Sequence, residues 1–392
     1  MPWRTTDTMN ERTKFVHRLE NGERMSDLCR EFGISRKTGY KILQRYTEEG
    51  LMGLKDKSRR PFKSPNRTPR LLVELIVEMR TLRPTWGPKK IHWALERDHP
   101  GVILPAKSTI ALILKREGLV KGRKRRRNAA HTSFDALTKG EASNDVWAID
   151  FKGQFRVGSK KYCYPLTVTD HFSRYLLCCD ALENTKWQPV KYSLIELFSK
   201  YGLPHVMRSD NGAPFGSTGR FGLTKLGTWM MRQGIKLERI EPGHPEQNGR
   251  HERMHRTLKQ ETTRPPKSNI LSQQECFDKY IRDFNENRPH EALGMKPPAS
   301  VYTSSSRPFV PDLPPLEYPL HDLTSEVCTN GVATFRPLRK KFYIGQAFVG
   351  HNIGFRELDK YCWLAHFMHL ELGYIDLTTQ QFLTSTSTPK AL

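Results

Sequence analysis

The sequence has no apolar run approaching the roughly 18–20 residues that a membrane-spanning helix needs. Its N-terminus also lacks the apolar stretch of a signal peptide. The seven cysteines, at positions 29, 163, 178, 179, 276, 328 and 362, are odd in number and form no CxxC pair, which argues against a disulfide framework and a structural zinc site. These absences favour a soluble, cytoplasmic protein.

Acidic residues are also scarce. The chain has 41 Asp and Glu against 64 Lys and Arg, a formal net charge of +23. Such an excess suits a polyanionic partner, and nucleic acid is favoured over a membrane surface. With 392 residues, the chain is too long for one compact core and is expected to form two to four domains.

The N-terminal 54 residues have the pattern of a helix-turn-helix domain. In residues 25–46, MSDLCREFGISRKTGYKILQRY, Gly33 provides the turn and Ser35 is suited to cap the second helix. That helix would read DNA through four side chains, Arg36, Lys37, Thr38 and Lys41. The alternative is a three-helix bundle with a solvated basic face.

A second helical set follows a Pro-rich basic linker at 55–69. Apolar residues at helical spacing predict helices over 71–82, 88–97 and 108–118, the last capped by Ser108 or Thr109. This second domain (70–120) also resembles a helix-turn-helix unit. A basic linker (121–142) comes next, in which a phosphate-tracking run is formed by Lys121, Arg123, Lys124, Arg125, Arg126 and Arg127. Alternatively, this run is a nuclear-targeting signal or a solvated charge cluster.

From residue 143 the pattern changes to strands. Apolar and aromatic runs at 146–157, 161–172 and 174–182 predict three meandering strands, followed by alternating helix and strand to residue 240. This order predicts an α/β core with a mixed five-stranded sheet. It is the order of an RNase H-like fold, although other α/β folds would fit it nearly as well.

Acidic residues stand at distinctive places in this core. Asp150 interrupts the apolar strand VWAIDF, and Asp210 ends a short strand before the turn Asn211-Gly212. Two glutamates follow, Glu246 and Glu252. On a helix, Glu252 shares one face with Arg256 and Lys259, whereas Glu246 suits the positive end of the helix dipole. Glu252 is therefore the favoured third acid.

The stretches WAIDFKG, RSDNG and PEQNGRHERMHRTLK resemble the three signatures of D-D-E transposases and retroviral integrases. The resemblance implies an RNase H-like catalytic core (143–303) in which Asp150, Asp210 and Glu252 are catalytic and bind two Mg²⁺ ions, with Mn²⁺ as an alternative. The family's frequent interval of thirty-five residues would select Glu246, whereas forty-one residues (211–251) precede Glu252. An extension in the Gly-rich segment 213–227 explains the longer interval.

Downstream, FNENRPHEALGMKPPASVY (284–302) is similar to the segment that closes the catalytic domain of bacterial insertion-sequence transposases. A Pro- and Ser-rich linker (304–322) and short strand-like runs follow. These runs predict a small β-barrel at 323–381, before the tail at 382–392. The resemblance to transposases and integrases implies that this barrel is SH3-like and contacts DNA through Arg339, Lys340 and Lys341. Three histidines lie near the acids, His244, His251 and His255. They are expected to be ordinary surface residues, with assistance of proton transfer or DNA contact by one of them as the alternative.

Together these patterns predict a transposase that binds the inverted-repeat DNA ends of a mobile element, cleaves them and joins the 3′-hydroxyl ends to target DNA. Arg256 and Lys259 would hold phosphates beside the acids. Joining two ends implies at least a homodimer on DNA, in a nucleoid-associated protein of bacteria. The alternatives are a catalytically inactive DNA-binding repressor and a nuclease without a joining step.

Overall fold

The computed structural model describes residues 7–58, 67–120, 137–241 and 244–384. The chain forms two compact units, Met1–Pro69 and Arg70–Leu392, and each is considered by itself. The basic run from Lys121 to Arg127 lies outside the described residues. Among the helices that are described, none is long and apolar enough to cross a bilayer.

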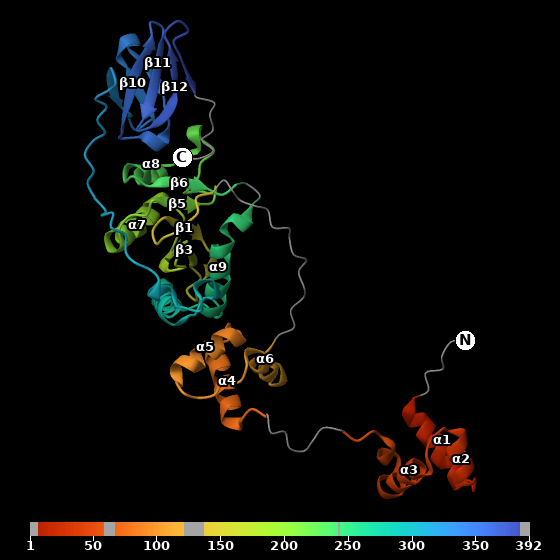
Figure 1. Cartoon of the computed structure of the whole chain (residues 1–392). Helices are drawn as coiled ribbons and strands as arrows, with labels where there is room; N and C mark the ends of the chain where they lie inside the picture. Colours follow the sequence, from red (N-terminus) through yellow and green to blue (C-terminus); the bar gives the residue numbers. More distant parts are fainter. Residues whose placement is uncertain (1–6, 59–66, 121–136, 242–243, 385–392) are drawn as a thin grey trace. The chain divides into compact units, whose positions relative to one another are not determined.

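The first unit is a small helical domain. It contains α1 (Thr8–Glu20), α2 (Met25–Glu31), α3 (Arg36–Glu49) and the short η1 (Gly50–Leu54) (Figure 1). Ser35 caps α3 as predicted, its side chain accepting from the Thr38 N–H at 3.1 Å. Gly39 is buried, and a Cβ there would meet the sulfur atoms of Met25 and Cys29 at 2.7 Å. The missing side chain of Gly39 therefore lets α3 pack closely on α2.

The second unit begins with α4 (Arg70–Leu82), α5 (Pro88–Asp98) and α6 (Lys107–Arg116). They share a core that includes Ile76, Trp86 and Ile91. The predicted side-chain cap of α6 is wrong, because α6 begins before Ser108 and its N-cap residue is Ala106, which has no capping side chain.

The central sheet is mixed and has six strands. They are β1 (Val146–Phe151), β2 (Phe155–Arg156), β3 (Tyr162–Asp170), β4 (Leu176–Leu182), β5 (Val206–Ser209) and β6 (Lys236–Arg239). β3 pairs antiparallel with β1, β2 and β4, whereas β5 runs parallel to β1 and β6. The predicted strands are present, and the two-residue β2 is the additional one.

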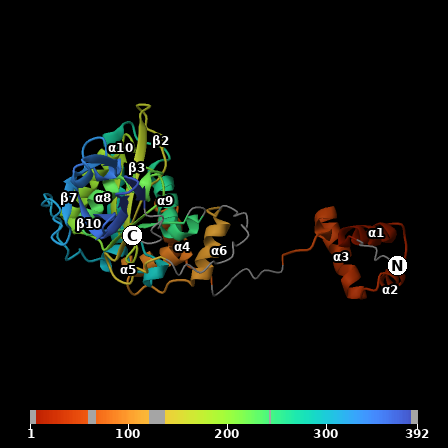
Figure 2. The same ribbon diagram turned by 90° about the horizontal axis from the view of Figure 1, so that it is seen from above.

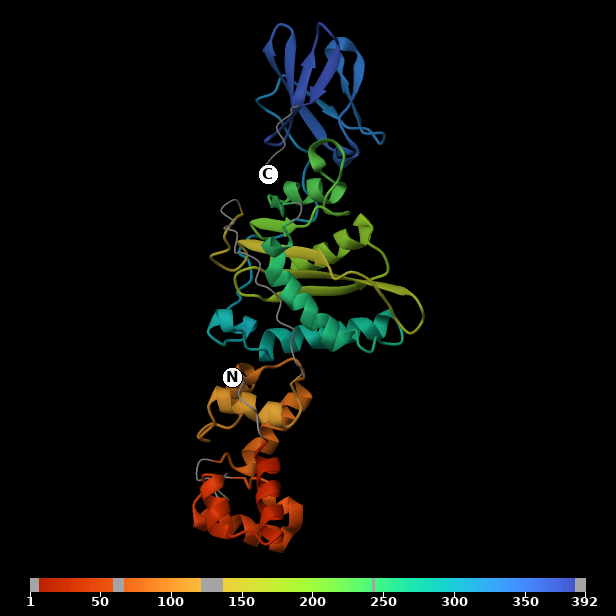
Figure 3. The ribbon, with the colours of Figure 1, turned by 90° about the vertical axis from the view of Figure 1, so that its right-hand side faces the viewer.

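Helices cover both faces of this sheet. On one face, α7 (Trp187–Tyr201) and α8 (Lys225–Arg232) pack on Trp147, Ile149 and other apolar side chains. On the opposite face, α9 (Gly249–Thr262) and α10 (Ile270–Arg282) pack on Leu176 and Cys179. Figure 3 shows α9 lying across the strands. Because β1 alternates its side chains, Ala148 and Asp150 face α9.

Short elements connect these helices: η2 (Arg220–Gly222), η3 (Pro245–Asn248), the π-helical turn η4 (Asp283–Asn287), η5 (Glu291–Leu293) and η6 (Pro298–Ser300). The α9–α10 connection also holds the tip of the β2–β3 hairpin, since the N–H groups of Gly158 and Ser159 donate to the carbonyls of Lys267 and Ser268. Figure 2 shows α10 beside this hairpin. The chain then returns past the sheet, where Tyr302 stacks on Tyr175.

The predicted linker at 304–322 contains no helix or strand but packs on the core, since the ring of Phe309 contacts those of Phe198 and Trp229. Beyond it are β7 (Leu323–Glu326), β8 (Val332–Phe335), β9 (Lys340–Tyr343), β10 (Asn352–Asp359), β11 (Cys362–Phe367), β12 (Leu370–Asp376) and β13 (Gln381–Thr384), with η7 (Arg336–Leu338) and η8 (Gln346–Phe348). The ladders form a five-stranded antiparallel sheet and a separate β8–β9 ribbon. These two sheets are not closed into a barrel in the described part of the chain.

Candidate active site

Asp150 is the last but one residue of β1, where the strand reaches the edge of the core. Its side chain is 23% exposed, so the carboxyl has lost much of its water. Its pKa is raised to about 7, mainly by burial and next by the negative charge of Asp210, with a further contribution from Glu252. These two acids therefore act electrostatically on the same carboxyl.

The sheet register explains why Asp210 lies near Asp150. β1 and β5 are adjacent and parallel, with Val146 opposite Val206 and Ala148 opposite Arg208. Two residues further along each strand, the same register leads to Asp150 and Asp210. The Asp210 carboxylate accepts from the Gly212 N–H at 3.1 Å, which fixes it in the predicted turn.

Glu252 reaches the same region from α9. It is exposed, as are Arg256 and Lys259, whereas Met254 and Leu258 are buried against the sheet. This distribution is the one that the helical spacing predicted. Glu246 lies outside α9, in η3, and its side chain is not among those described.

Lys152 is a neighbour that the sequence analysis did not identify. Burial lowers its pKa, as does the positive charge of Lys259, whereas the charges of Asp150 and Glu252 act in the opposite direction. Lys152 therefore places a cation beside the acids. Its position two residues after Asp150 was the available signal, since side chains two apart on an extended chain project to the same side.

Behind Asp150 lies a buried network of hydroxyls and imidazoles. The Thr167 Oγ1 atom lies 2.7 Å from His251 Nε2, 2.6 Å from His255 Nε2 and 3.0 Å from the backbone oxygen of Asp150. The Nδ1 atom of His251 lies 2.9 Å from the Thr169 hydroxyl. His255 Nδ1 in turn lies 3.7 Å from Oδ2 of Asp150.

Counting hydrogens fixes the tautomers of both histidines. A carbonyl oxygen only accepts, so the single Thr167 hydroxyl hydrogen goes to Asp150, and both imidazole Nε2 atoms must donate to Thr167. Burial lowers the pKa of His251 to about 3 and that of His255 far below its usual range, so both rings are neutral. The Nδ1 atom of His255 therefore presents a lone pair toward Asp150.

These positions correct one expectation. His251 and His255 are buried, so their assignment to the surface is wrong, while His244 is partly exposed and lies 3.9 Å from Glu241. At about 100° per residue, His251 and His255 fall next to Leu258 on the buried stripe of α9, and this spacing was the signal for burial. The ligand atoms of Asp150, His251 and His255 lie within 4.8 Å of one another.

The predicted DNA-contacting residues of the first unit lie at the start of α3. Arg36, Lys37, Thr38 and Lys41 are all exposed. Their side chains are therefore available to a ligand. At the other end of the chain, Arg339, Lys340 and Lys341 are exposed at the start of β9.

Four family models match the chain. Residues 140–245 and 233–298 match integrase core domains. Residues 11–62 match a helix-turn-helix domain and residues 38–114 a homeodomain-like domain. The matched regions contain the acids and the exposed positions of α3 described above.

Curated proteins of bacterial insertion elements and of retroviruses are similar in sequence to this chain. An uncharacterised protein of insertion element IS407 from Burkholderia multivorans is 26% identical over 60% of this chain and 82% of its own length. One of insertion element IS476 from Xanthomonas euvesicatoria is 26% identical over 64% of this chain and 69% of its own length. The Gag-Pol polyprotein of baboon endogenous virus is 32% identical over 35% of this chain and 8% of its own length. The chain thus joins helix-turn-helix domains to an integrase core and is related to the DDE-type insertion-sequence transposases.

Proposed function

We propose that the chain is a DNA transposase that binds the inverted-repeat ends of a mobile element, cleaves them and joins their 3′-hydroxyl ends to target DNA. In this proposal residues 1–54 and 70–120 recognise the ends, 143–303 carry out catalysis, and 323–381 form an SH3-like module on DNA. The segments between them, 55–69, 121–142 and 304–322, are linkers.

The observation that supports this proposal is the electrostatic influence on Asp150, in β1, of two further acids, Asp210 at the end of β5 and Glu252 on α9. Burial and the charges of Asp210 and Glu252 raise the pKa of Asp150. Such a cluster of acids is suited to binding a cation. The positive charge of a bound cation would offset the repulsion between the carboxylates and favour their ionised forms.

The donor set fits a divalent metal. Carboxylate oxygens are the ligands that Mg²⁺ prefers, and Asp150, Asp210 and Glu252 would hold it. Both nitrogens of His251 and Nε2 of His255 are already engaged by threonine hydroxyls, so His251 is unsuited as a ligand. When bound, two Mg²⁺ ions, or Mn²⁺ in their place, supply Lewis-acid activation of the attacking oxygen and stabilise charge on the leaving oxygen.

The chain's own residues contribute binding and positioning. Arg256 and Lys259 project from α9 beside Glu252 and would bind phosphates of the scissile strand. Thr167 holds His255 against the back of Asp150 and so limits where its carboxylate can turn. On α3, Arg36, Lys37, Thr38 and Lys41 would contact DNA. The run Lys121 to Arg127 would add phosphate contacts without sequence preference.

Joining two DNA ends in one reaction requires two copies of the terminal sequence at once, so the active form would be at least a homodimer on DNA. The proposal places the protein with the bacterial nucleoid, where its DNA substrate lies.

The test is an assay for both cleavage and joining on DNA carrying element ends, with Mg²⁺ present. Asp150→Asn, Asp210→Asn and Glu252→Gln should each reduce both products by at least about 100-fold while DNA affinity stays near that of the wild type. Glu246→Gln is the matched control and should remain active. Activity that depended on Glu246 and not on Glu252 would overturn the assignment of the third acid.

Two further outcomes would change the function itself. If the wild type binds end DNA but is as inactive as Asp150→Asn in cleavage and joining, the protein would be a repressor. Nicked ends without joined product, from a protein whose Asp150→Asn variant is inactive, would identify a nuclease.

A further inference from the structure

A cavity of about 490 Å³ lies beside α9, inside the second unit. Most of its wall comes from the start of α5, the β3–β4 turn, α9 and the segment that follows η4, with further residues from β1 and the end of β3. Six lining residues are cationic, namely Lys90, Arg174, Arg250, Arg253, Arg256 and Arg288, whereas two are acidic, Asp170 and Glu291. This space is called the basic cavity.

The acids in the wall are already engaged. Asp170 accepts from the N–H of Asn144 at 2.8 Å and from both the N–H and the hydroxyl of Ser173. Glu291 pairs with Lys89, outside the cavity, at 2.7 Å. Of the six cations, Arg288 pairs with Glu261. The other five still outnumber the acids of the wall, so the basic cavity keeps an excess of positive charge.

The groups in the wall respond to this charge. The pKa of Lys90 is lowered to about 8, mainly by burial and next by the positive charge of Arg288. Burial, followed by repulsion from Arg250, lowers the pKa of Arg174 to about 10. An anion in the cavity would relieve this repulsion between like charges.

Two buried polar atoms in the wall have no partner among the described residues. One is Nε of Arg288, whose side chain is 5% exposed, and the other is Nε2 of His290. Buried polar groups in proteins normally have a hydrogen-bond partner. The Nη2 group of Arg288 already donates to Glu261 and Thr85. Its unpartnered Nε–H is a charged donor that an oxyanion oxygen suits.

Most of the α9 side chains that line the basic cavity lie away from the acid cluster. At about 100° per residue around α9, Arg250, Arg253 and Thr257 lie roughly 100° to 160° from Glu252, whereas Arg256, at about 40°, lies between the cavity and Glu252. A DNA strand whose phosphate occupied the cavity would therefore be held at a second point, away from the acids.

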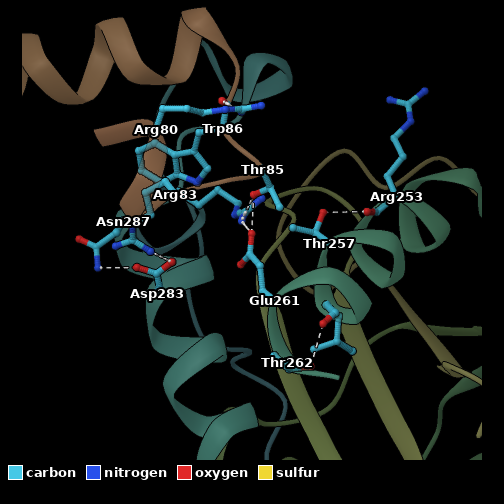
Figure 4. A network of polar contacts seen from close by, with 12 residues as sticks. Arg80, Arg83, Thr85, Trp86, Arg253, Thr257, Glu261, Thr262, Asp283 and Asn287 are labelled. Atoms are coloured by element: carbon cyan, nitrogen blue, oxygen red, sulfur yellow. Dashed lines mark hydrogen bonds and ion pairs between the residues drawn. The ribbon is translucent and has the colours of Figure 1, made fainter. Parts of the chain in front are cut away.

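The wall also joins the helical domain α4–α6 to the integrase core. Figure 4 shows Glu261 directed toward Thr85, with Arg83 beside Asp283. Glu261 accepts from the Thr85 hydroxyl and from Arg288, and Arg83 pairs with Asp283. Occupation of the basic cavity would thus involve both the domain proposed to recognise DNA ends and the domain proposed to cut them.

We propose that the basic cavity binds a phosphate group of a DNA strand, on the side of α9 away from Glu252. The proposal rests on the proposed DNA-binding function. It gives Arg288 and His290, from the stretch that resembles the closing segment of the catalytic domain, a direct part in binding.

The test measures DNA affinity of the full chain in EDTA, so that no cleavage is needed. The probe is a labelled duplex with a single-stranded overhang, prepared with either a 5′-phosphate or a 5′-hydroxyl, and its anisotropy is followed across a range of salt concentrations. Lys90→Gln and Arg253→Gln should each lower the slope of log affinity against log salt by about 1, as expected for one lost phosphate contact. An effect with both probes indicates an internal phosphodiester, and an effect with only the phosphorylated probe indicates a strand end.

A matched control separates the cavity from surface charge in general. Arg282→Gln removes an exposed arginine of α10 that does not line the cavity. This variant should keep the wild-type slope. Arg288→Gln, checked for folding by circular dichroism, should behave like Lys90→Gln, because its buried side chain is out of reach of a duplex lying on the outer surface.

The results distinguish this proposal from the proposed function. If the wild type binds DNA and Lys90→Gln matches Arg282→Gln in slope, the cavity proposal is overturned while the transposase proposal stands. If the wild type binds no DNA, both fall.

Discussion

The Nδ1 atom of His255 lies 3.7 Å from the Oδ2 atom of Asp150, which is too far for a hydrogen bond. The Thr167 hydroxyl holds the ring with its Nε2–H pointing away from the acid. The carboxylate therefore meets a lone pair, not a proton donor, at its buried side. An imidazole in this state does not stabilise the negative charge of Asp150, and that task is left to a cation on the open side of the site.

Replacing Thr167 tests this network. Thr167→Val keeps the shape but removes the acceptor of two buried N–H groups, and each buried donor left unpaired costs about 1–3 kcal/mol. Thr169→Val leaves only the Nδ1 acceptor of His251 unpaired. Differential scanning fluorimetry should therefore give a larger decrease in Tm for Thr167→Val than for Thr169→Val. The reverse order would contradict the proposed tautomers.

Asp150 should make stability depend on pH. Its folded-state pKa is about 7 against an ordinary value of 3.8, so between these values the folded protein keeps a proton that the unfolded chain has lost. Stability contributed by this group therefore falls as the pH rises from about 4 to about 7. In EDTA, Asp150→Asn should raise the Tm more at pH 8 than at pH 5.

In EDTA at pH 8 the Tm of Asp150→Asn should exceed that of the wild type, and adding Mg²⁺ should make the wild type the more stable of the two. A ligand that binds only the folded state stabilises it, and the variant lacks one of the carboxylates that would bind the ion. Asp278→Asn, at an exposed position of α10, is the control and should follow the wild type in both buffers. A gain for Asp150→Asn that is equal at both pH values would show that the carboxyl is not perturbed.

The sequence predicted much of the core for local reasons. The apolar runs specified β1, β3 and β4, and the apolar stripe of α9 correctly placed Met254 and Leu258 inside. The burial of His251 and His255 in the same stripe was not predicted, because the prediction followed the polarity of histidine and not the position of these residues on the apolar face of the helix. Burial became possible only through Thr167 and Thr169, which come from another element.

Long-range contacts account for most of what was not predicted. Thr85 and Glu261 are 176 residues apart in the chain, and no local pattern relates them. The C-terminal strands were predicted from alternation, but closure of a barrel depends on pairing between sheet edges. Among the strands of the described residues, β8 pairs with β9 alone, which alternation within a strand does not specify.

The contacts between α4–α6 and the core should differ strongly in energy. Glu261→Gln leaves Arg288, with its side chain 5% exposed, without its charged partner, and breaking a buried pair from one side costs about 3–5 kcal/mol. Lys89→Gln breaks an exposed pair with Glu291, worth at most about 1 kcal/mol. Hydrogen exchange over α4–α6 should increase in the first variant and remain near wild type in the second. Equal effects would contradict a buried contact.

The exposed start of α3 should govern DNA affinity of the first unit. Lys37→Gln and Lys41→Gln each remove one cation without touching the core, so each should weaken binding to any duplex and lower the salt slope by about 1. Lys14→Gln on α1, where Lys14 pairs with Glu11 at 3.2 Å, removes the same charge from another helix and should leave the slope unchanged. Because the three variants have the same net charge, a uniform effect would mean that the first unit attracts DNA by total charge, whereas an effect confined to α3 identifies that helix as the contacting element.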